Sequence, residues 1–231
     1  GVKIYNGGSP FISRCWMRDV LIGASSKAAA AAGLGPRDGL ILDGTGIFLA
    51  EKVTIAANRR HGLVSDSTGV EPNTTLKFDM CSFVENGFGP AETEGFGIYL
   101  QGSTSIAEFN GGNSEANKYG EAKLVSVNNA RFRDFDFETT TADQDFVVMV
   151  LATTCNPVVI DNCNFLRGSS VTVGKATFAI SAESCGNVHV FSNRFGGWTN
   201  AGMIRLDNAS FRCHVHDNHL LTGAYIEDYS V

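Results

Sequence analysis

The stretches VVIDNCNF (158–165), VHVFSNRF (188–195) and CHVHDNHL (213–220) decide the fold of this 231-residue chain. In each stretch, apolar residues first alternate with other residues. The stretch then ends with Asn or Cys, one polar residue and one large apolar residue, in that order. Similar phrases occur at 11–17, 53–60, 76–83 and 125–132, so that successive phrases end 23 to 49 residues apart. Repetition at such a period is typical of architectures whose units bury their apolar faces by stacking on one another.

A second strand-like phrase lies between most of these copies. Examples are GLILDG (39–44), FGIYLQG (96–102) and ATFAISA (176–182). They are short and largely follow a period of two, whereas no repeat shows the i, i+3, i+4 spacing of a helix over three turns. The sequence therefore predicts an all-β fold, a single-stranded right-handed parallel β-helix of about seven rungs, where a rung is one turn of the coil.

Two segments interrupt the repeat. Residues 25–38 contain a run of Ala closed by Gly and Pro, which predicts a short helix near 25–35 that ends at Gly33 or Gly35. Residues 85–120 are rich in Gly, Asn and Glu and are predicted to form a long loop excursion, although FGIYLQG leaves open an extra rung there. We expect residues 1–231 to form one β-helix domain that is a fragment of a longer chain, because both ends read like coil interior.

The position two residues before the last apolar residue of each phrase is small or an amide, which suits an inward-facing corner. The residues at this position are Cys15, Asn58, Cys81, Ala130, Cys163, Asn193 and Asn218. Three of the six Cys thus share one column in alternate rungs, beyond the reach of a disulfide. We expect all six thiols to be free and most of the 16 Phe to stack in the core.

Composition removes several classes of function. The net charge is −6 and Lys and Arg are scattered, which argues against a nucleic-acid partner because binding phosphates needs a basic stripe. No apolar run approaches 18 residues, so no membrane insertion is expected. The chain has no phosphate-binding G-x-x-x-x-G-K-[ST] motif and no Cys/His zinc spacing. We therefore predict no cofactor and no metal site.

Acidic residues near the corners are the candidates for catalysis. Counting two residues past the phrase ends places Glu85 and Asp134 in adjacent rungs, about 5 Å apart, with Arg167 one rung further on. Such a pair suits acid–base or nucleophilic work on a glycosidic bond, and an extra rung would widen it to about 10 Å. Asp136 and Glu138 extend an acidic stripe from Asp134. The alternative is a solvated strand face with polar turns.

The two-phrase rung resembles the right-handed parallel β-helix proteins of the pectate-lyase-like group over nearly the whole chain. The motifs R-x-P-x-x-R, G-H-G and R-I-K of its pectin-degrading members do not occur, so no catalytic residue is carried over from them. With its uncapped ends, Gly- and Asn-rich excursions and acidic composition, the chain is similar to bacteriophage tailspikes and tail fibres. That resemblance implies a homotrimer on a virion tail, assembled in the host cytoplasm and acting outside it.

The same resemblance implies a bacterial surface polysaccharide as the partner, bound and hydrolysed through groove carboxylates. On this hypothesis Glu85, Asp134 and Asp136 are catalytic, while Arg167, Glu138 and Trp198 contact the substrate, Trp198 by stacking on sugar rings. Two alternatives stay open. One is a non-catalytic structural or receptor-binding segment of a tail fibre, and the other is an extracellular polysaccharide lyase, which would need a base and a cation.

Overall fold

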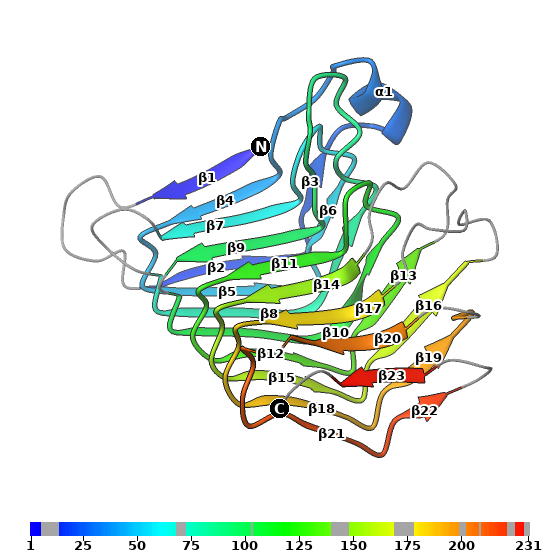
Figure 1. Ribbon diagram of the computed structural model, residues 1–231. Helices are drawn as coiled ribbons and strands as arrows, with labels where there is room; N and C mark the ends of the chain where they lie inside the picture. The colour runs from blue at the N-terminus through cyan, green and yellow to red at the C-terminus, as the bar shows by residue number, and fades with distance from the viewer. Residues whose placement is uncertain are drawn as a thin grey trace.

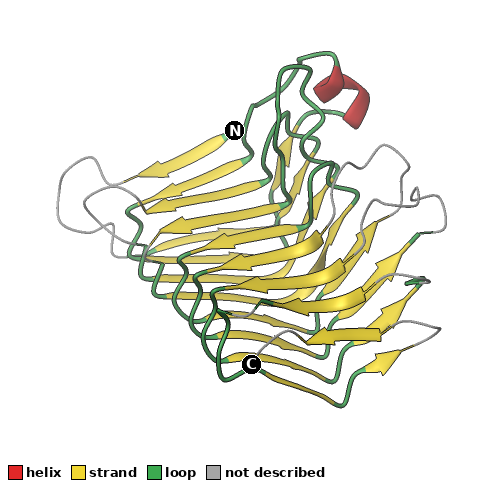
Figure 2. Ribbon diagram, viewed as in Figure 1, coloured by secondary structure: helices red, strands yellow, loops and turns green. Residues whose placement is uncertain are grey.

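The computed structural model is a coil of short strands stacked along one axis (Figure 1). It describes residues 1–5, 14–67, 73–102, 104–139, 148–168, 178–198, 202–207, 209–220 and 225–228. Strands dominate and one short helix lies near the N-terminal end of the coil (Figure 2). All paired strands in the described residues are parallel, so the predicted parallel β-helix is confirmed.

One face of the coil is a nine-stranded sheet that takes one strand from each turn. Its strands are, in spatial order, β1 (Val2–Tyr5), β4 (Leu40–Asp43), β7 (Leu63–Ser67), β9 (Ile98–Gly102), β11 (Ala122–Val125), β14 (Val148–Thr153), β17 (Phe178–Glu183), β20 (Gly202–Leu206) and β23 (Tyr225–Asp228). In Figure 1 this sheet runs from β1 at the top to β23 near the bottom. Every strand between β1 and β23 therefore pairs with the equivalent strands of the turns before and after it.

The rest of each turn belongs to a 14-stranded sheet bent into two legs. Strands of the first leg are β2 (Cys15–Arg18), β5 (Ile47–Glu51), β12 (Ala130–Arg133), β15 (Val158–Asp161), β18 (Val188–Phe191) and β21 (His214–His216). Strands of the second leg are β3 (Leu21–Gly23), β6 (Thr54–Ala56), β13 (Asp136–Thr139), β16 (Asn164–Arg167), β19 (Arg194–Gly196) and β22 (His219–Leu220). Two ten-residue strands, β8 (Thr75–Val84) and β10 (Ile106–Glu115), run through both legs.

The strands make eight complete rungs, and β23 begins a ninth. The expected number was about seven, and the difference lies between residues 83 and 132, where β9 and β10 form the extra rung that FGIYLQG had left open. The excursion predicted over 85–120 is therefore a long loop only over residues 85–97, and a short turn over 116–120 follows β10. The predicted helix is present as α1 (Lys27–Ala31), which Ser26 caps by accepting a hydrogen bond from the Ala29 N–H.

The bend between the two legs, which we call the middle corner, repeats the same backbone geometry in every rung. One residue per rung lies there in the left-handed region, with φ between 52° and 61°. The corner residues are Asp19, Lys52, Met80, Gly111, Asp134, Asn162, Ser192 and Asp217. This conformation is unfavourable for most side chains, but Asp and Asn tolerate it best. Ladder hydrogen bonds on both sides of the corner hold it in place.

Phenylalanine rings fill the interior in two columns. Phe78, Phe109 and Phe132 stack on the first leg with centroids 4.9 and 4.8 Å apart. On the second leg Phe137, Phe165 and Phe195 stack at 4.9 and 5.0 Å. All six are buried, and their spacing equals that of neighbouring strands because parallel strands in register bring equivalent side chains directly over one another. The expected aromatic core is confirmed, although Phe132 belongs to the first-leg column.

The thiols are free, as predicted. Cys81 and Cys163 share one inward column just after the middle corner, but Cys15 lies on the first leg opposite Phe48. Cys155 and Cys185 occupy neighbouring rungs, where the Cys155 N–H donates to the Cys185 sulfur over 3.4 Å. Burial raises the pKa of Cys81 to about 11, so this thiol stays protonated and behaves as a small apolar side chain.

A ladder of buried amides closes the corner that leads from the second leg into the next rung. The Asn58 Nδ2 donates to Asn86 Oδ1 over 2.8 Å, and Asn86 Nδ2 donates to Asn117 Oδ1 over 2.8 Å. Asn117 in turn donates to the carboxyl group of Glu121, which also accepts from Ser114 Oγ at 2.9 Å. All five side chains are buried, so the ladder satisfies backbone and side-chain groups that water cannot reach.

Glu121 makes the stability of the fold depend on pH. Burial raises the pKa of this carboxyl group from 4.5 to about 8, more than hydrogen bonds from Asn117 and Ser114 lower it. The folded state therefore holds the proton more tightly than the unfolded state. We expect the free energy of unfolding to be highest below about pH 4.5 with respect to this group and to fall as pH rises to about 8. Glu121→Gln should remove this part of the pH dependence.

Urea unfolding of the two proteins at a series of pH values measures the effect. The quantity of interest is the difference in free energy of unfolding between Glu121→Gln and the parent chain. That difference should shift in favour of the variant as pH rises through the neutral range. Gln has the shape of Glu and can still accept hydrogen bonds through its amide oxygen, but it carries no charge at any of these pH values. A difference that stays constant over this range would contradict the assignment.

Candidate functional site

An open groove follows the outer side of the middle corner. Two adjoining hollows make it, and Asp134 lines both. One hollow, of about 430 Å³, is lined by Glu51, Asp79, Met80, Asn110, Gly111 and Asp134. The other, of about 380 Å³, is lined by Asp134, Asp136, Asn162, Asn164 and Arg194. We call the whole feature the corner groove. It spans six rungs, or roughly 24 Å at the spacing of neighbouring strands.

Carboxylates and amides of neighbouring rungs pair along this groove. Asn110 donates to Asp79 over 3.0 Å, Asn162 to Asp134 over 2.5 Å, and Asn164 to Asp136 over 2.6 Å. These pairs form because equivalent residues of neighbouring rungs lie one strand spacing apart, within reach of short side chains. In each pair, the hydrogen bond engages one oxygen of the carboxylate. Arg194 adds a guanidinium one rung beyond Asn164.

The structure does not bring Glu85 and Asp134 together, so their predicted pairing is wrong. Glu85 follows β8, at the corner that leads to the next rung, and its N–H donates to the Glu115 carbonyl. Asp134 lies at the middle corner two rungs later. The cause is the phrase at 125–132, whose paired asparagines belong to another corner. The segment in register with 158–165 is 130–137.

The corner groove also lacks the three residues predicted to contact the substrate, which are Arg167, Glu138 and Trp198. Arg167 is in register with Thr139 and belongs to the column of Glu85. Glu138 faces Glu115 of the preceding rung. Burial raises the pKa of Glu138, and the charges of Glu115 and Asp136 raise it further. Of the acidic stripe, the structure therefore brings only Asp134 and Asp136 into the groove.

Trp198 is not an exposed platform for sugar rings. Its side chain is 1% exposed, and its indole Nε1 donates to the Phe165 carbonyl over 3.1 Å. The preceding Gly197, at a φ of 79°, lies so close to the Arg167 backbone that a Cβ there would clash. The bend therefore turns Trp198 inward, where it is part of the hydrophobic core.

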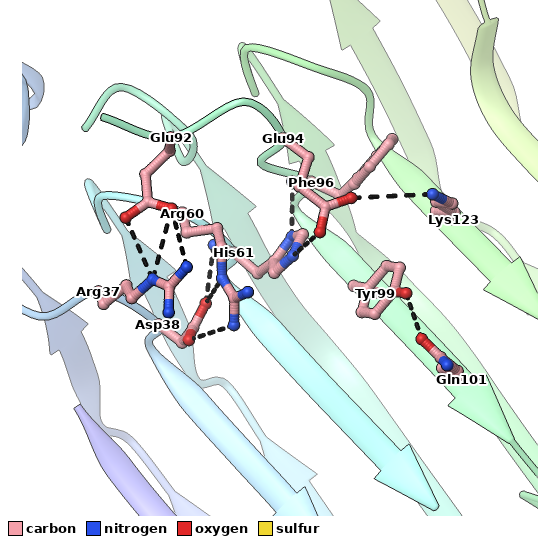
Figure 3. Close-up of polar contacts among 10 residues, drawn as sticks. All are labelled: Arg37, Asp38, Arg60, His61, Glu92, Glu94, Phe96, Tyr99, Gln101 and Lys123. Carbon is pink, nitrogen blue, oxygen red and sulfur yellow. Dashed lines mark hydrogen bonds and ion pairs between the residues drawn. The ribbon is translucent and has the colours of Figure 1, made fainter. Parts of the chain in front are cut away.

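A second polar cluster lies where the 85–97 loop meets the nine-stranded sheet (Figure 3). We call it the loop–sheet cluster, and its residues are Arg37, Asp38, Arg60, His61, Glu92, Glu94, Phe96, Tyr99, Gln101 and Lys123. Asp38 holds Arg60 through two hydrogen bonds of 2.8 Å and accepts the His61 N–H at 3.2 Å. These contacts fix the turn that leads into β7.

His61 is the buried centre of this cluster. Its Nδ1 accepts the Phe96 N–H over 3.0 Å, and its ring stacks on Tyr99 with a centroid distance of 4.7 Å. Burial lowers the pKa of His61 to about 3, and the positive charge of Arg60 contributes. The imidazole is therefore neutral near pH 7, and its remaining proton lies on Nε2.

Glu94 faces both His61 and Lys123. Its Oε1 lies 3.7 Å from His61 Nε2, and its Oε2 lies 3.8 Å from Lys123 Nζ. Lys123 Nζ also lies over the rings of Phe96 and Tyr99, 5.4 and 5.5 Å from their centroids. None of these residues is among the site residues that the sequence analysis singles out. The residues of the loop–sheet cluster come from four separate segments without a shared motif, and only the coil brings them together.

Comparisons with known proteins find no counterpart for this arrangement. No protein-family model matches the chain, and no curated protein or solved structure is significantly similar to it. Across the described ranges, no three His, Cys, Asp or Glu side chains are grouped so that they could hold a metal ion, and no helix is long and apolar enough to cross a bilayer. What is established is the class, a parallel β-helix with a polar groove along one corner.

Proposed function

We propose that the chain is a receptor-binding β-helix of the bacteriophage tailspike kind, which holds a bacterial surface polysaccharide along the corner groove. The observation that carries this proposal is the repetition of carboxylate–amide pairs over successive rungs. A polysaccharide is itself a repeating chain of hydroxyl groups, so a linear row of hydrogen-bonding groups is complementary to it. The site of action would be the virion tail outside the cell.

Hydrolysis of the bound glycan is the second candidate, and one observation favours it. Asp134, at the middle corner, and Asp136, the first residue of β13, line the same hollow. Glycosidases that act by acid–base or nucleophilic chemistry use two carboxyl groups that flank the scissile bond. In this proposal the Asp134 and Asp136 carboxyls are the catalytic pair, and Asn162, Asn164 and Arg194 orient the sugar. Glu85 has no part in it.

One panel of capsular and O-antigen polysaccharides tests both candidates, by binding and by release of reducing ends. Arg194→Ala should weaken binding about tenfold, because it removes a charged hydrogen-bond donor from the groove. Asp134→Asn and Asp136→Asn should keep binding within a few-fold, since the amide oxygen can still accept the hydrogen bond from the neighbouring rung and Asn tolerates the left-handed backbone of residue 134. If Asp134 and Asp136 are the catalytic pair, each of these two variants should cleave the glycan at least about 100-fold more slowly than the parent chain.

Glu108→Gln is the matched control, an outward carboxylate of the first leg that pairs with Lys77 outside the groove. It should change neither binding nor cleavage. Binding without cleavage in the parent chain would reject hydrolysis and leave the receptor-binding function. Binding that is unchanged by Arg194→Ala would reject the corner groove as the site.

The proposed function includes a homotrimer. Support comes from three large apolar side chains that are exposed on the first two rungs, Trp16 at 67%, Leu21 at 72% and Leu49 at 36%. Trp16 and Leu49 are neighbours in register, and Leu21 follows the same corner. An apolar patch of this kind marks a surface that is covered in an assembly. In side-by-side coils it would form the contact between subunits.

Light scattering coupled to size exclusion tests this assembly. The parent chain should have three times the mass of one chain, and Trp16→Glu should give a monomer because a buried charge opposes the contact. Leu166→Glu, at an apolar residue of the sixth rung that is 38% exposed, should leave the trimer intact. A monomeric parent chain at every concentration would count against the proposal.

A further inference from the structure

The geometry points to a second binding site, in the loop–sheet cluster. We propose that His61 and Lys123 form a receptor for a carboxylate, that the chain's own Glu94 occupies it, and that an acidic sugar of the uronate type displaces Glu94. The site lies at the beginnings of β7, β9 and β11 in the nine-stranded sheet, whereas the corner groove follows the bend of the other sheet. The inference therefore does not depend on the function proposed for that groove.

The first argument is an unsatisfied donor. His61 is 1% exposed, and its Nδ1 is occupied by the Phe96 N–H, so Nε2 carries the proton. In the part of the chain that the structure describes, Nε2 has no hydrogen-bond partner. The nearest carboxylate oxygen, of Glu94, lies at 3.7 Å, which is too far for a hydrogen bond. Binding of an acceptor within hydrogen-bond distance of such a buried N–H is favourable, because it removes the free-energy cost of an unsatisfied donor.

The second argument is the convergence of charge. Lys123 Nζ lies 3.8 Å from the other oxygen of the same carboxylate, so one carboxylate faces a neutral N–H donor and an ammonium group. Figure 3 shows Glu94 between His61 and Lys123. Arg60 lies close enough to Glu94 for the carboxylate to stabilise its charge, but Asp38 already holds its guanidinium. The site is thus built for one negative group.

The third argument is that Glu94 is loosely held. Two residues away on the same loop, Glu92 is 12% exposed and accepts a hydrogen bond from Arg37 Nε over 3.1 Å. The Glu94 side chain is 42% exposed, and both its contacts exceed 3.5 Å. Glu94 therefore fills the receptor without the short hydrogen bonds that a fixed carboxylate makes. A ligand carboxylate with better geometry can replace it, at a cost set by how often Glu94 occupies the site.

The surroundings favour a sugar acid over a simple anion. The half-buried Tyr99 ring lies beside the receptor, and its hydroxyl donates to Gln101. Aromatic carbon next to a hydroxyl and an amide suits the apolar face and the hydroxyl groups of a pyranose ring. A uronate residue carries these features together with the carboxylate that His61 and Lys123 would bind.

Isothermal titration of the full chain with methyl β-D-glucuronide tests the inference, and methyl β-D-glucoside is the neutral counterpart. Glu94→Ala should bind the glucuronide about tenfold more tightly than the parent chain if Glu94 fills the receptor about nine-tenths of the time. The same variant should not gain affinity for the glucoside. Adding Lys123→Met to Glu94→Ala should abolish the gain.

Glu108→Ala is the matched control, because it removes a partly exposed, lysine-paired carboxylate elsewhere on the coil. A similar gain in glucuronide affinity in that variant would mean that the smaller negative charge of the chain alone explains the tighter binding, and would overturn the proposal. Equal glucuronide affinity of Glu94→Ala and the parent chain, or no binding by either at millimolar ligand, would also overturn it. Thermal melts of each variant establish that it is folded before titration. Loss of Arg194 in the corner groove should not affect this binding.

Discussion

Stacking of equivalent residues, one strand spacing apart, is the constraint on which the rest of this structure depends. It requires every rung to turn at the same corner, and one residue per rung adopts the unfavourable left-handed backbone conformation there. In return, each strand completes its ladder with the rungs above and below, and the phenylalanine rings stack at the same interval. The amide ladder of Asn58, Asn86 and Asn117 follows from the same constraint at the next corner.

The same constraint turns the sequence into columns on the surface. A polar residue at a corner position meets the polar residue one turn later, which is how Asp134 meets Asn162 and Asp136 meets Asn164. The corner groove is therefore a property of the repeat. The loop–sheet cluster has a different origin, since the 85–97 loop leaves the coil and brings Glu94 against His61 and Lys123. Interruptions of a regular coil are where a site without repeat symmetry can be built.

The fold class, the short helix, the free thiols and the aromatic core could be predicted from the sequence, because each depends on local composition or on the period of the repeat. The register could not be predicted throughout. In VSVNNARF the asparagines at 128 and 129 resemble a middle corner, yet Asn129 lies at the bend before the first leg, in line with Asn187. Polar residues serve both corners, so composition alone does not distinguish them. The phrases at 11–17 and 53–60 are likewise out of register with the phrase at 76–83.

These errors of register decided the outcome for the candidate site. Asp134 and Asp136 were found because they stand next to a recognisable strand, whereas Glu85 was paired with Asp134 only through the misaligned phrase. Trp198 could not be placed from sequence, because the turn at Gly197 determines which way the ring points. His61, Glu94 and Lys123 lie far apart in sequence, and nothing in their spacing indicates that they meet.

The central claim is the register of the rungs, including the extra one between residues 83 and 132. Spin labels at Glu51→Cys and His216→Cys test it most directly, in a background with Cys15 and Cys213 replaced by Ser. Both sites lie in one outward column, six rung intervals apart. Double electron–electron resonance should give a separation of about 29 Å. A separation of about 24 Å, one interval shorter, would contradict the account.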